Sequence, residues 1–421
     1  MSYGKLDGKF KKNAHQFVQC LSDCSPTQMT GSMKAQRIYL DHNATSPLLA
    51  DARAAMLAAL TMTGNPSSVH AEGRAIRAMV NAARAEVADL CGAEPSQVIF
   101  TSGATEAANH LLTPCYLMGR SALDIGGLFV SAVEHPCVLS GGRFLAENVI
   151  VLPVDRSGCL DLSALKAGLA GHDRDRGLPM LALQLANNET GVIQPVAEAA
   201  RIVHEYGGLL VVDAVQGAGR LALSRAALGA DFLFLSSHKL GGPVGVGAIV
   251  AAGQALMPIA LMAGGGQEKG HRGGTENAPA IAGFGAAARA AGRGLEAMAY
   301  VRGLRDDLER RLRALAYDIV IHGQTADRLA NTSFFSLPGL KSETAQIGFD
   351  MDGIAVSSGS ACASGKVGPS HVLKAMGADP ELGAIRISLA ASTTQADIER
   401  FVSAFATINR RRLSRRPAEA A

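Results

Sequence analysis

Short runs of apolar residues, separated by stretches of helical composition, recur from residue 97 to residue 251. Apolar runs without polar alternation are typical of strands buried on both faces, as parallel strands are in α/β sheets. We therefore predict an α/β fold with a mostly parallel sheet covered by helices. The expected strands are 97–101, 128–133, 149–154, 180–185, 209–213, 231–236 and 246–251, and the expected helices are 50–60, 71–91, 162–170 and 195–206.

A different pattern follows residue 285. The stretch 286–315 is rich in Ala, Arg, Leu and Glu and is expected to be helical. Strand-like runs then occur at 331–337, 353–357 and 384–389. Because a chain of 421 residues is longer than one hydrophobic core usually serves, we predict two domains. A large domain would span 37–285, and a small α+β domain would span 286–410 and pack with the segment near 37–50.

Composition favours a folded enzyme over several other classes of protein. Hydrophobic residues make up 48% of the chain and charged residues 18%, which is typical of a globular protein. A net charge of +3 is too small to indicate a nucleic-acid or membrane partner. No apolar stretch reaches the roughly 18 residues of a membrane helix. The seven cysteines lack a paired spacing, which favours a reducing cytoplasm and no metal site.

The two ends of the chain differ from the rest. Residues 1–36 are polar and without clear periodicity, and Gly31-Ser32-Met33 resembles a junction before a start at Met33. We therefore interpret them as leader or added sequence. Residues 411–421 are rich in arginine and are expected to form a solvated basic tail.

Two strand-like runs end in residues that can carry chemistry. One ends at Asp213, with Gln216 close behind, and the next ends at Ser236, followed by His238 and Lys239. Open α/β sheets bind ligands at the carboxyl ends of their strands, so these side chains are expected at one rim. A lysine that binds pyridoxal 5'-phosphate (PLP) covalently, and a carboxylate that keeps its ring nitrogen protonated, are what a PLP enzyme needs. A solvent-exposed lysine is the alternative.

Three further segments could complete a cofactor site. Phe100–Glu106 has the pattern of a strand, a turn and a helix start, whose free N–H groups and Thr105 hydroxyl could bind a phosphate. His135 follows the expected strand 128–133 and could stack on a cofactor ring, although histidines at strand ends are more often structural. The glycine-dense segment 264–277 is expected to approach a ligand or a neighbouring subunit closely.

Cys362 differs from the other cysteines in its surroundings. It lies among small and polar residues, which predicts an exposed, mobile loop where a thiol can act as a nucleophile. Four others are expected in the core as small apolar residues, namely Cys91, Cys115, Cys137 and Cys159. Arg386, within a strand-like run, could bind a substrate carboxylate through two hydrogen bonds, and a solvent-facing arginine is the alternative.

Nine segments, in the same order, resemble the cysteine desulfurases of the NifS/IscS type, which are class-V members of the fold-type I PLP enzymes. The resemblance extends from about Ile38 to Ala406. The segments are Tyr39–Thr45, Gly64–His70, Thr101–Glu106, Glu134–His135, Asn187–Gly191, Asp213–Gln216, Ser236–Lys239, Gly273–Asn277 and Ser357–Cys362. The uninterrupted segment around Cys362, followed by Pro369–Leu373, resembles the NifS/IscS group rather than the SufS-like group.

The resemblance implies a role for each matching residue. Lys239, Cys362 and His135 would be catalytic, and Asn188 and Arg386 would bind the substrate carboxylate. PLP would be held by Lys239 covalently, Asp213 at the ring nitrogen, Gln216 at the ring oxygen, His135 by stacking, and Thr105, Ser236, His238 and the second subunit's Thr275 at the phosphate. A homodimer would convert L-cysteine to L-alanine and leave a persulfide on Cys362. The sulfur would pass to an acceptor such as an iron–sulfur scaffold protein, with tRNA thiolation as a second destination.

Alternative functions remain open from the sequence. A selenocysteine lyase would use the same site and could act without Cys362, whereas another class-V lyase or an aminotransferase has no use for a mobile cysteine. A scaffold without activity is disfavoured because Lys239, Asp213 and Cys362 are all present. One departure concerns Ala390-Ala391, which stands where the family usually has Gly-Arg or Ser-Arg. We expect altered local packing there, with activity retained.

Overall fold

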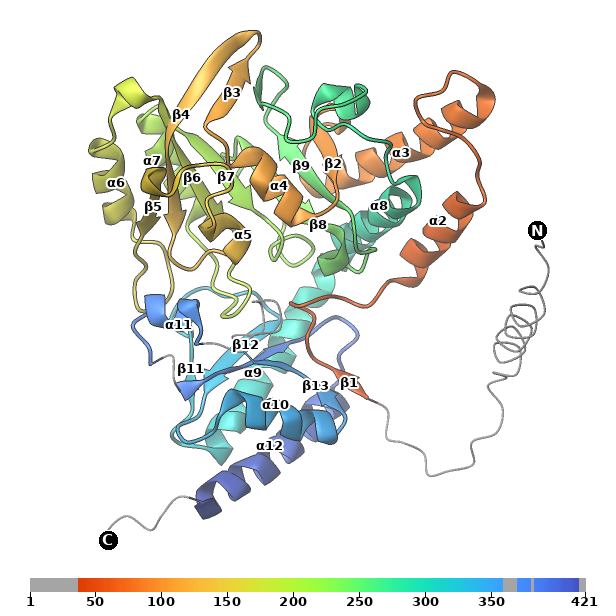
Figure 1. The fold of residues 1–421 in the computed structure, drawn as a ribbon. Helices are drawn as coiled ribbons and strands as arrows, with labels where there is room; N and C mark the ends of the chain where they lie inside the picture. Colours follow the sequence, from red (N-terminus) through yellow and green to blue (C-terminus); the bar gives the residue numbers. More distant parts are fainter. Residues whose placement is uncertain (1–36, 359–368, 380–381, 416–421) are drawn as a thin grey trace, which may run out of the picture. The chain divides into compact units, whose positions relative to one another are not determined.

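The computed structural model describes residues 37–358, 369–379 and 382–415 (Figure 1). Within these residues the largest sheet has nine strands, eight of them in the order β10-β3-β4-β6-β7-β8-β9-β2, with β5 paired to β4. The strands are β2 (Val98–Thr101), β3 (Cys115–Met118), β4 (Ser121–Ser131), β5 (Val149–Leu152), β6 (Leu178–Gln184), β7 (Leu209–Asp213), β8 (Phe232–Ser236), β9 (Gly247–Ala251) and β10 (Leu256–Pro258).

The middle of this sheet is parallel, as the apolar runs predict. Strands β5, β4, β6, β7 and β8 run in one direction, with Met180 opposite Leu209 and Val211 opposite Phe232. Strand β9 is antiparallel to both β8 and β2, and β3 is antiparallel to both β4 and β10. The sheet is therefore mixed and mostly parallel, and the prediction of an α/β fold is confirmed.

Alternate side chains of the central strands enter two hydrophobic clusters. In β7, Leu210 and Val212 lie in the cluster that contains α3, α6, α7 and α8, whereas Leu209 and Val211 lie in the cluster that contains α4 and α5. This is the arrangement of a sheet covered by helices on both faces. The helices of this part of the chain, which also include α2, have these bounds: α2 (Ala50–Leu60), α3 (Ala71–Leu90), α4 (Ala104–Leu111), α5 (Pro136–Leu139), α6 (Leu162–Ala170), α7 (Val196–Glu205) and α8 (Ala278–Arg293).

A second, antiparallel sheet is built from the C-terminal part of the chain. Its strand order is β11-β12-β15-β14, while β1 pairs in parallel with β13, and Asp41 bridges to Ser388 of β15. A third hydrophobic cluster joins Leu40 to Leu308 and Phe401. The elements are β1 (Ile38–Tyr39), α9 (Met298–Leu315), β11 (Val320–Ile321), β12 (Thr332–Ser336), α10 (Ser342–Met351), β13 (Ile354–Ala355), β14 (Ser357–Ser358), α11 (His371–Ala375), β15 (Ile385–Ser388) and α12 (Gln395–Arg415).

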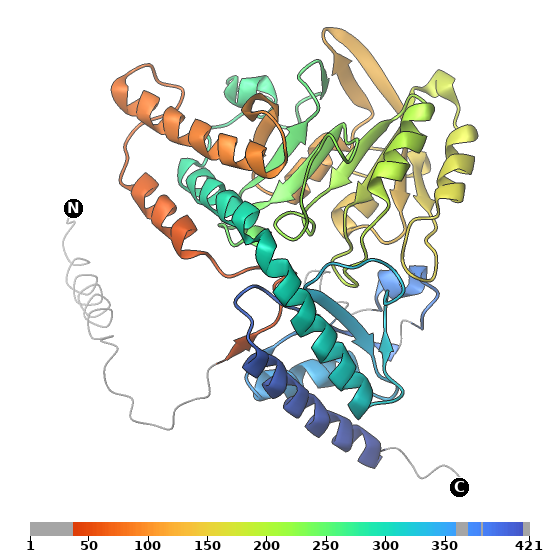
Figure 2. The same ribbon diagram turned by 180° about the vertical axis from the view of Figure 1, so that it is seen from behind.

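A long helical path links the two sheets. Helix α8, the 3-10 turn η6 (Gly294–Ala297) and α9 follow one another without a break (Figure 2). The path begins at Ala278, earlier than the expected residue 286, because the Asn277 side chain caps it by accepting a hydrogen bond from the Ala280 N–H at 3.2 Å. The expected domain boundary at residue 285 lies within α8, and the division into two domains stays a prediction. None of the helices in the described ranges is both long and apolar enough to cross a membrane.

Candidate active site

A cavity of about 510 Å³ lies at the carboxyl ends of β6, β7 and β8. Neighbouring parallel strands end at the same edge of a sheet, so residues far apart in the sequence meet there. The residues predicted from the sequence that line this cavity are Thr105, His135, Asn188, Asp213, Gln216, Ser236, His238 and Lys239. The strand-end pattern therefore located the rim of the sheet where these side chains gather.

Lys239 lies in a short 3-10 helix, η4 (Ser237–Leu240), directly after β8. Its Nζ donates hydrogen bonds to the main-chain oxygens of Asn43, at 2.6 Å, and Ala44, at 2.7 Å. The amine is thus held at the cavity wall and does not extend into solvent as in the alternative interpretation. Gln216 is tied to the same segment, because its Nε2 donates to the Asn43 oxygen at 3.0 Å. No individual role was predicted for Asn43 or Ala44 from the sequence.

Asp213 is the last residue of β7 and is only 8% exposed. Its Oδ1 accepts a hydrogen bond from the Val215 N–H at 2.9 Å. Burial raises the pKa of Asp213 to about 6, an effect that this hydrogen bond and the positive charge of Lys239 partly offset. A buried carboxylate of this kind is stabilised by a ligand that brings an N–H group or a positive charge.

His135 is the N-cap of α5, and its Nδ1 accepts a hydrogen bond from the Cys137 N–H at 3.2 Å. Burial, reinforced by Lys239 and His371, lowers the pKa of His135 to about 4, so its ring is neutral at pH 7. The Cys137 Sγ lies 3.0 Å from the same nitrogen and also lines the cavity. A neutral imidazole at the wall presents a flat, uncharged surface to an aromatic ligand.

The expectation that four cysteines lie in the core is correct only for Cys91. Cys115 is exposed, and Cys137 and Cys159 are half-buried. Cys115 is the first residue of β3 and Cys137 lies in the short helix α5, and apolar neighbours in the sequence do not imply burial at either position. Cys137 in particular belongs to the cavity wall.

The turn between β2 and α4 forms the other wall of the cavity, with Ser102, Gly103 and Ala104 lining it. The first N–H groups of a helix are free to bind an anion, so the start of α4 suits a phosphate. The turn packs tightly on β9, where a Cβ added to Gly247 would lie 2.8 Å from the Gly103 carbonyl carbon. Only a glycine at 247 allows this close approach of the two backbones.

His238 also lines the cavity. Its Nδ1 lies 3.1 Å from the Thr45 Oγ1, and burial, followed by the charge of Lys239, lowers the pKa of His238 to about 4. Since His135 and His238 are both neutral at pH 7, an anion in the cavity would be met by N–H and O–H donors and by the Lys239 amine.

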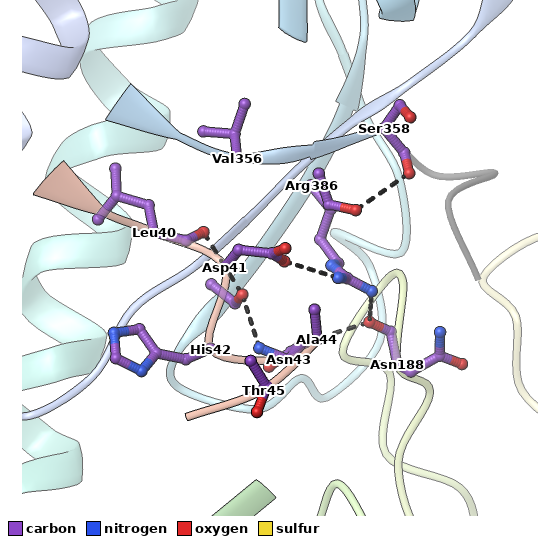
Figure 3. Close-up of polar contacts among 12 residues, drawn as sticks. Leu40, Asp41, His42, Asn43, Ala44, Thr45, Asn188, Val356, Ser358 and Arg386 are labelled. Carbon is purple, nitrogen blue, oxygen red and sulfur yellow. Dashed lines mark hydrogen bonds and ion pairs between the residues drawn. The ribbon is translucent and has the colours of Figure 1, made fainter. Parts of the chain in front are cut away.

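Arg386 lies outside the cavity lining and is the largest side chain that is almost completely buried. Its Nη2 donates to Asp41 Oδ1 at 2.8 Å, and its Nη1 donates to the Asn188 main-chain oxygen at 3.0 Å (Figure 3). Asn43 Nδ2 donates to the same oxygen at 3.2 Å. The alternative of a solvent-facing arginine is therefore wrong. Asp41 is an ionic partner that the sequence analysis did not identify.

Besides Arg386, two further predicted site residues, Thr275 and Cys362, are not among the described residues that line the cavity. Thr275 is exposed and does not line it, so its contribution from a second subunit stays a prediction. Cys362 lies outside the described residues. The residues that follow are anchored near the rim, because Ser370 Oγ donates to Glu189 Oε2 at 2.6 Å and His371 Nε2 lies 2.9 Å from the Glu134 main-chain oxygen.

Ala390 and Ala391 line a second cavity, of about 340 Å³, with Lys239 and Arg220 also in its wall. The departure from the usual family residues thus coincides with open space behind the Lys239 segment. Its walls are mainly apolar side chains, such as Leu49.

The donor set around the larger cavity suits PLP. Asp213 offers a buried carboxylate for a ring N–H, Lys239 an amine for an aldehyde, and the start of α4 a set of N–H groups for a phosphate. Ser236 and His238 add further polar groups to the cavity lining. All of them border one cavity, so a single molecule of that size could contact every one.

Known proteins match this chain over most of its length. The family model for class-V aminotransferases matches residues 38–401. A cysteine desulfurase from Cereibacter sphaeroides is 42% identical over 376 residues, which cover 87% of this chain and 94% of that protein. An IscS-like cysteine desulfurase from Mycobacterium tuberculosis is 37% identical over 370 residues, covering 86% and 93%. A solved structure, the NifS-like protein from Rickettsia africae ESF-5, has a TM-score of 0.80 at 34% identity and covers 89% of this chain and 100% of that one.

Proposed function

Since this chain belongs to the class-V aminotransferase family, and within it to the cysteine desulfurases of the NifS/IscS type, we propose that it is a PLP-dependent enzyme that removes sulfur from L-cysteine. The observation that carries the proposal is the meeting of Lys239 and Asp213 at one cavity, beside the start of α4. The products would be L-alanine and a persulfide on Cys362.

PLP, when bound, supplies an electron sink for the bonds around the substrate Cα. Asp213 would keep the ring nitrogen protonated, and a positive charge beside it would favour its ionised form. The neutral His135 ring would pack on the cofactor ring, and Gln216 would contact the ring oxygen. The phosphate would be held by Thr105, Ser236, His238 and the N–H groups at the start of α4, joined by Thr275 of a second subunit.

Lys239 would hold the cofactor covalently, and as a free amine its Nζ can hold or move a proton at the substrate. Its position supports this role, because the oxygens of Asn43 and Ala44 hold the same nitrogen at 2.6 and 2.7 Å. Those oxygens stabilise the protonated amine. The free amine is therefore kept at the cavity wall, where it can donate a proton.

Asn188 and Arg386 bind the substrate carboxylate. The Arg386 guanidinium is held by Asp41 and by the Asn188 oxygen, which fixes the orientation of its plane. A substrate carboxylate competes with Asp41 for this guanidinium. The Cys362 thiolate forms a bond with the substrate sulfur while the bond between that sulfur and the substrate Cβ breaks, and the protonated carbon fragment leaves as alanine.

The sulfur then passes from Cys362 to an acceptor protein. We propose an iron–sulfur scaffold protein as the acceptor, in the cytoplasm, and a homodimer as the working assembly. Names of relatives that are cysteine desulfurases and IscS-like proteins support this destination.

The test is the release of alanine and sulfide from L-cysteine by the purified holoenzyme and by Cys362→Ala. We expect the wild type to form alanine, with sulfide release dependent on a thiol reductant, and the variant to bind PLP but lose both products. The persulfide is read directly as a mass increase of one sulfur atom on Cys362. Sulfide release by the variant at the wild-type rate would show that Cys362 does not carry the sulfur, and a preference for selenocysteine by both proteins would favour a selenocysteine lyase.

A further inference from the structure

Two ion pairs tie the segment 264–277 to two helices, one to α3 and one to α4, the helix that follows the β2–α4 turn. Glu268 accepts hydrogen bonds from Arg84 of α3 at 2.6 and 2.7 Å. Arg272 Nε donates to Glu106 Oε1 of α4 at 3.0 Å. Figure 1 shows the segment, in green before α8, lying beside β2 and α3. The segment is thus fastened at two points to the part of the fold that suits a phosphate.

The first ion pair, Arg84–Glu268, is buried, and both of its side chains also form hydrogen bonds with the backbone of β2. The side chains of Arg84 and Glu268 are 14% and 2% exposed. Glu268 Oε2 accepts a further hydrogen bond from the Phe100 N–H at 3.0 Å, and Arg84 Nη1 donates to the Val98 oxygen at 2.8 Å. The Arg84 guanidinium also lies 4.7 Å from the centre of the Phe100 ring. The pair therefore fixes the strand that leads directly into Ser102 and the turn.

The backbone at Glu268 and Lys269 adopts an unfavourable conformation, which indicates that the contacts of these two residues stabilise it. Glu268 and Lys269 have φ angles of 45° and 59°, in the left-handed region that side chains with a Cβ rarely adopt. Such backbone persists only where surrounding contacts hold it. The bonds from Glu268 to Arg84 and Phe100, and the bond from Lys269 Nζ to the Ser96 oxygen at 3.0 Å, are contacts of that kind.

The second pair acts on the turn itself. Glu106 Oε2 accepts a hydrogen bond from the Ser102 N–H at 2.8 Å, so its carboxylate closes the turn where α4 begins. Arg272 holds that carboxylate, and the two side chains are 18% and 11% exposed. The direction of the free N–H groups at the start of α4 thus depends on a residue of the segment 264–277.

We propose that Glu268 is a positioning residue for the cofactor phosphate. Its hydrogen bonds to Arg84 and to the Phe100 N–H hold β2, the strand that leads into the β2–α4 turn. The same bonds hold the segment 264–277 in the conformation in which Arg272 contacts Glu106. Glu268 does not line the cavity and so does not touch the cofactor itself. The inference rests on the proposed function, because it concerns the affinity for PLP.

The test compares Glu268→Gln with a matched control, Glu309→Gln. Glu309 accepts two hydrogen bonds from Arg328, at 2.8 and 3.0 Å, and the side chains of this pair are 5% and 7% exposed, but neither lines the cavity. Each apoprotein is titrated with PLP, and the dissociation constant is measured from the absorbance of the bound cofactor, alongside the thermal unfolding midpoint. We expect both variants to unfold at lower temperature, with the PLP dissociation constant raised about tenfold or more by Glu268→Gln alone.

A wild-type dissociation constant in Glu268→Gln, or an equal rise in Glu309→Gln, would overturn the positioning role. If Glu268→Gln does not fold, Arg272→Gln replaces it, because that pair is less buried and acts on the same turn. Arg272→Gln is then expected to weaken PLP binding in the same direction, and unchanged binding would overturn the inference. A wild-type apoprotein that does not bind PLP would instead contradict the proposed function.

Discussion

The burial of Asp213 lowers the stability of the apoprotein and favours a ligand that brings an N–H group or a positive charge. Burial raises its pKa from 3.8 to about 6. An acid with a higher pKa in the folded chain binds its proton more tightly there, so its contribution to stability falls as the pH rises from about 4 to about 6. Above that range the ionised carboxylate destabilises the apoprotein by an amount on the order of 3 kcal/mol. A bound ring N–H would compensate for this loss.

The substitution Asp213→Asn should therefore stabilise the apoprotein and weaken the enzyme. We expect a higher free energy of unfolding than wild type at pH 7.5, by about 1–3 kcal/mol, with a gain that shrinks as the pH is lowered towards 5. The PLP-loaded variant should lose most of its alanine production. Urea unfolding at both pH values measures the first effect. An apoprotein that is less stable than wild type at pH 7.5 would show that Asp213 is not held against its ionisation.

The residues that the sequence could identify are those whose side chains follow a recognisable strand end. Lys239 and Asp213 are of that kind, since each follows a short apolar run. The Asn43 oxygen that accepts a hydrogen bond from Lys239 is a main-chain atom. Every residue has such an oxygen, so this contact could not be predicted from the residue type. Asp41 and Arg386 are 345 positions apart, so their ion pair depends on the folded chain and has no local pattern.

Among the elements, α11 has an N-terminus that links it to the active-site rim. Ser370 Oγ accepts a hydrogen bond from the Leu373 N–H at 3.1 Å and donates to Glu189 Oε2 at 2.6 Å. Replacing a serine cap with alanine costs about 1 kcal/mol, and the buried Glu189 carboxyl also loses a donor. Helix α11 follows the segment of Cys362 in the sequence, so its start sets where that segment ends.

We expect Ser370→Ala to lower the free energy of unfolding by about 1–3 kcal/mol and to slow persulfide formation. Urea unfolding at pH 7 and single-turnover labelling of Cys362 measure the two effects. Ser163→Ala is the control, because Ser163 is an exposed serine in the first turn of α6 whose helix is capped by Asp161. Stability within about 0.5 kcal/mol of wild type for both variants would rule out a role for the Ser370 cap.

Elements with a clear composition, such as an alanine-rich helix or a run of branched apolar residues, could be predicted, and very short elements could not. Helix α2 and strand β7 have the bounds expected from their composition. Strands β3 and β10 were not predicted, because they are only four and three residues long, and an apolar run that short does not distinguish a strand from other structure. Their pairing joins Met118 to Leu256, and a contact that distant in sequence leaves no local trace.

For the whole molecule, the face of α2 that points away from α8 indicates a further contact. Ala52 lies in a small hydrophobic cluster with two alanines of α8, and Ala59 is also buried. Leu57 and Leu60, on the same helix, are 53% and 64% exposed. Apolar side chains on both faces of a surface helix are typical of an interaction surface. A homodimer, as proposed from the family resemblance, would cover them.

Replacing both Leu57 and Leu60 with Glu should therefore convert a dimer into a monomer, because two buried charges per subunit would have no partner in an apolar interface. Sedimentation velocity of the holoenzyme measures the change in mass. The control is Leu315→Glu, at the end of α9, where a leucine that is 40% exposed is expected to tolerate the charge without a change in assembly.

If PLP affinity also depends on the second subunit's Thr275, the monomeric variant should bind PLP more weakly, in the same way as Thr275→Ala in the intact dimer. A Leu57→Glu/Leu60→Glu protein that remains a dimer would place the subunit contact elsewhere, and a monomer with wild-type PLP affinity would exclude Thr275 as a ligand of the phosphate.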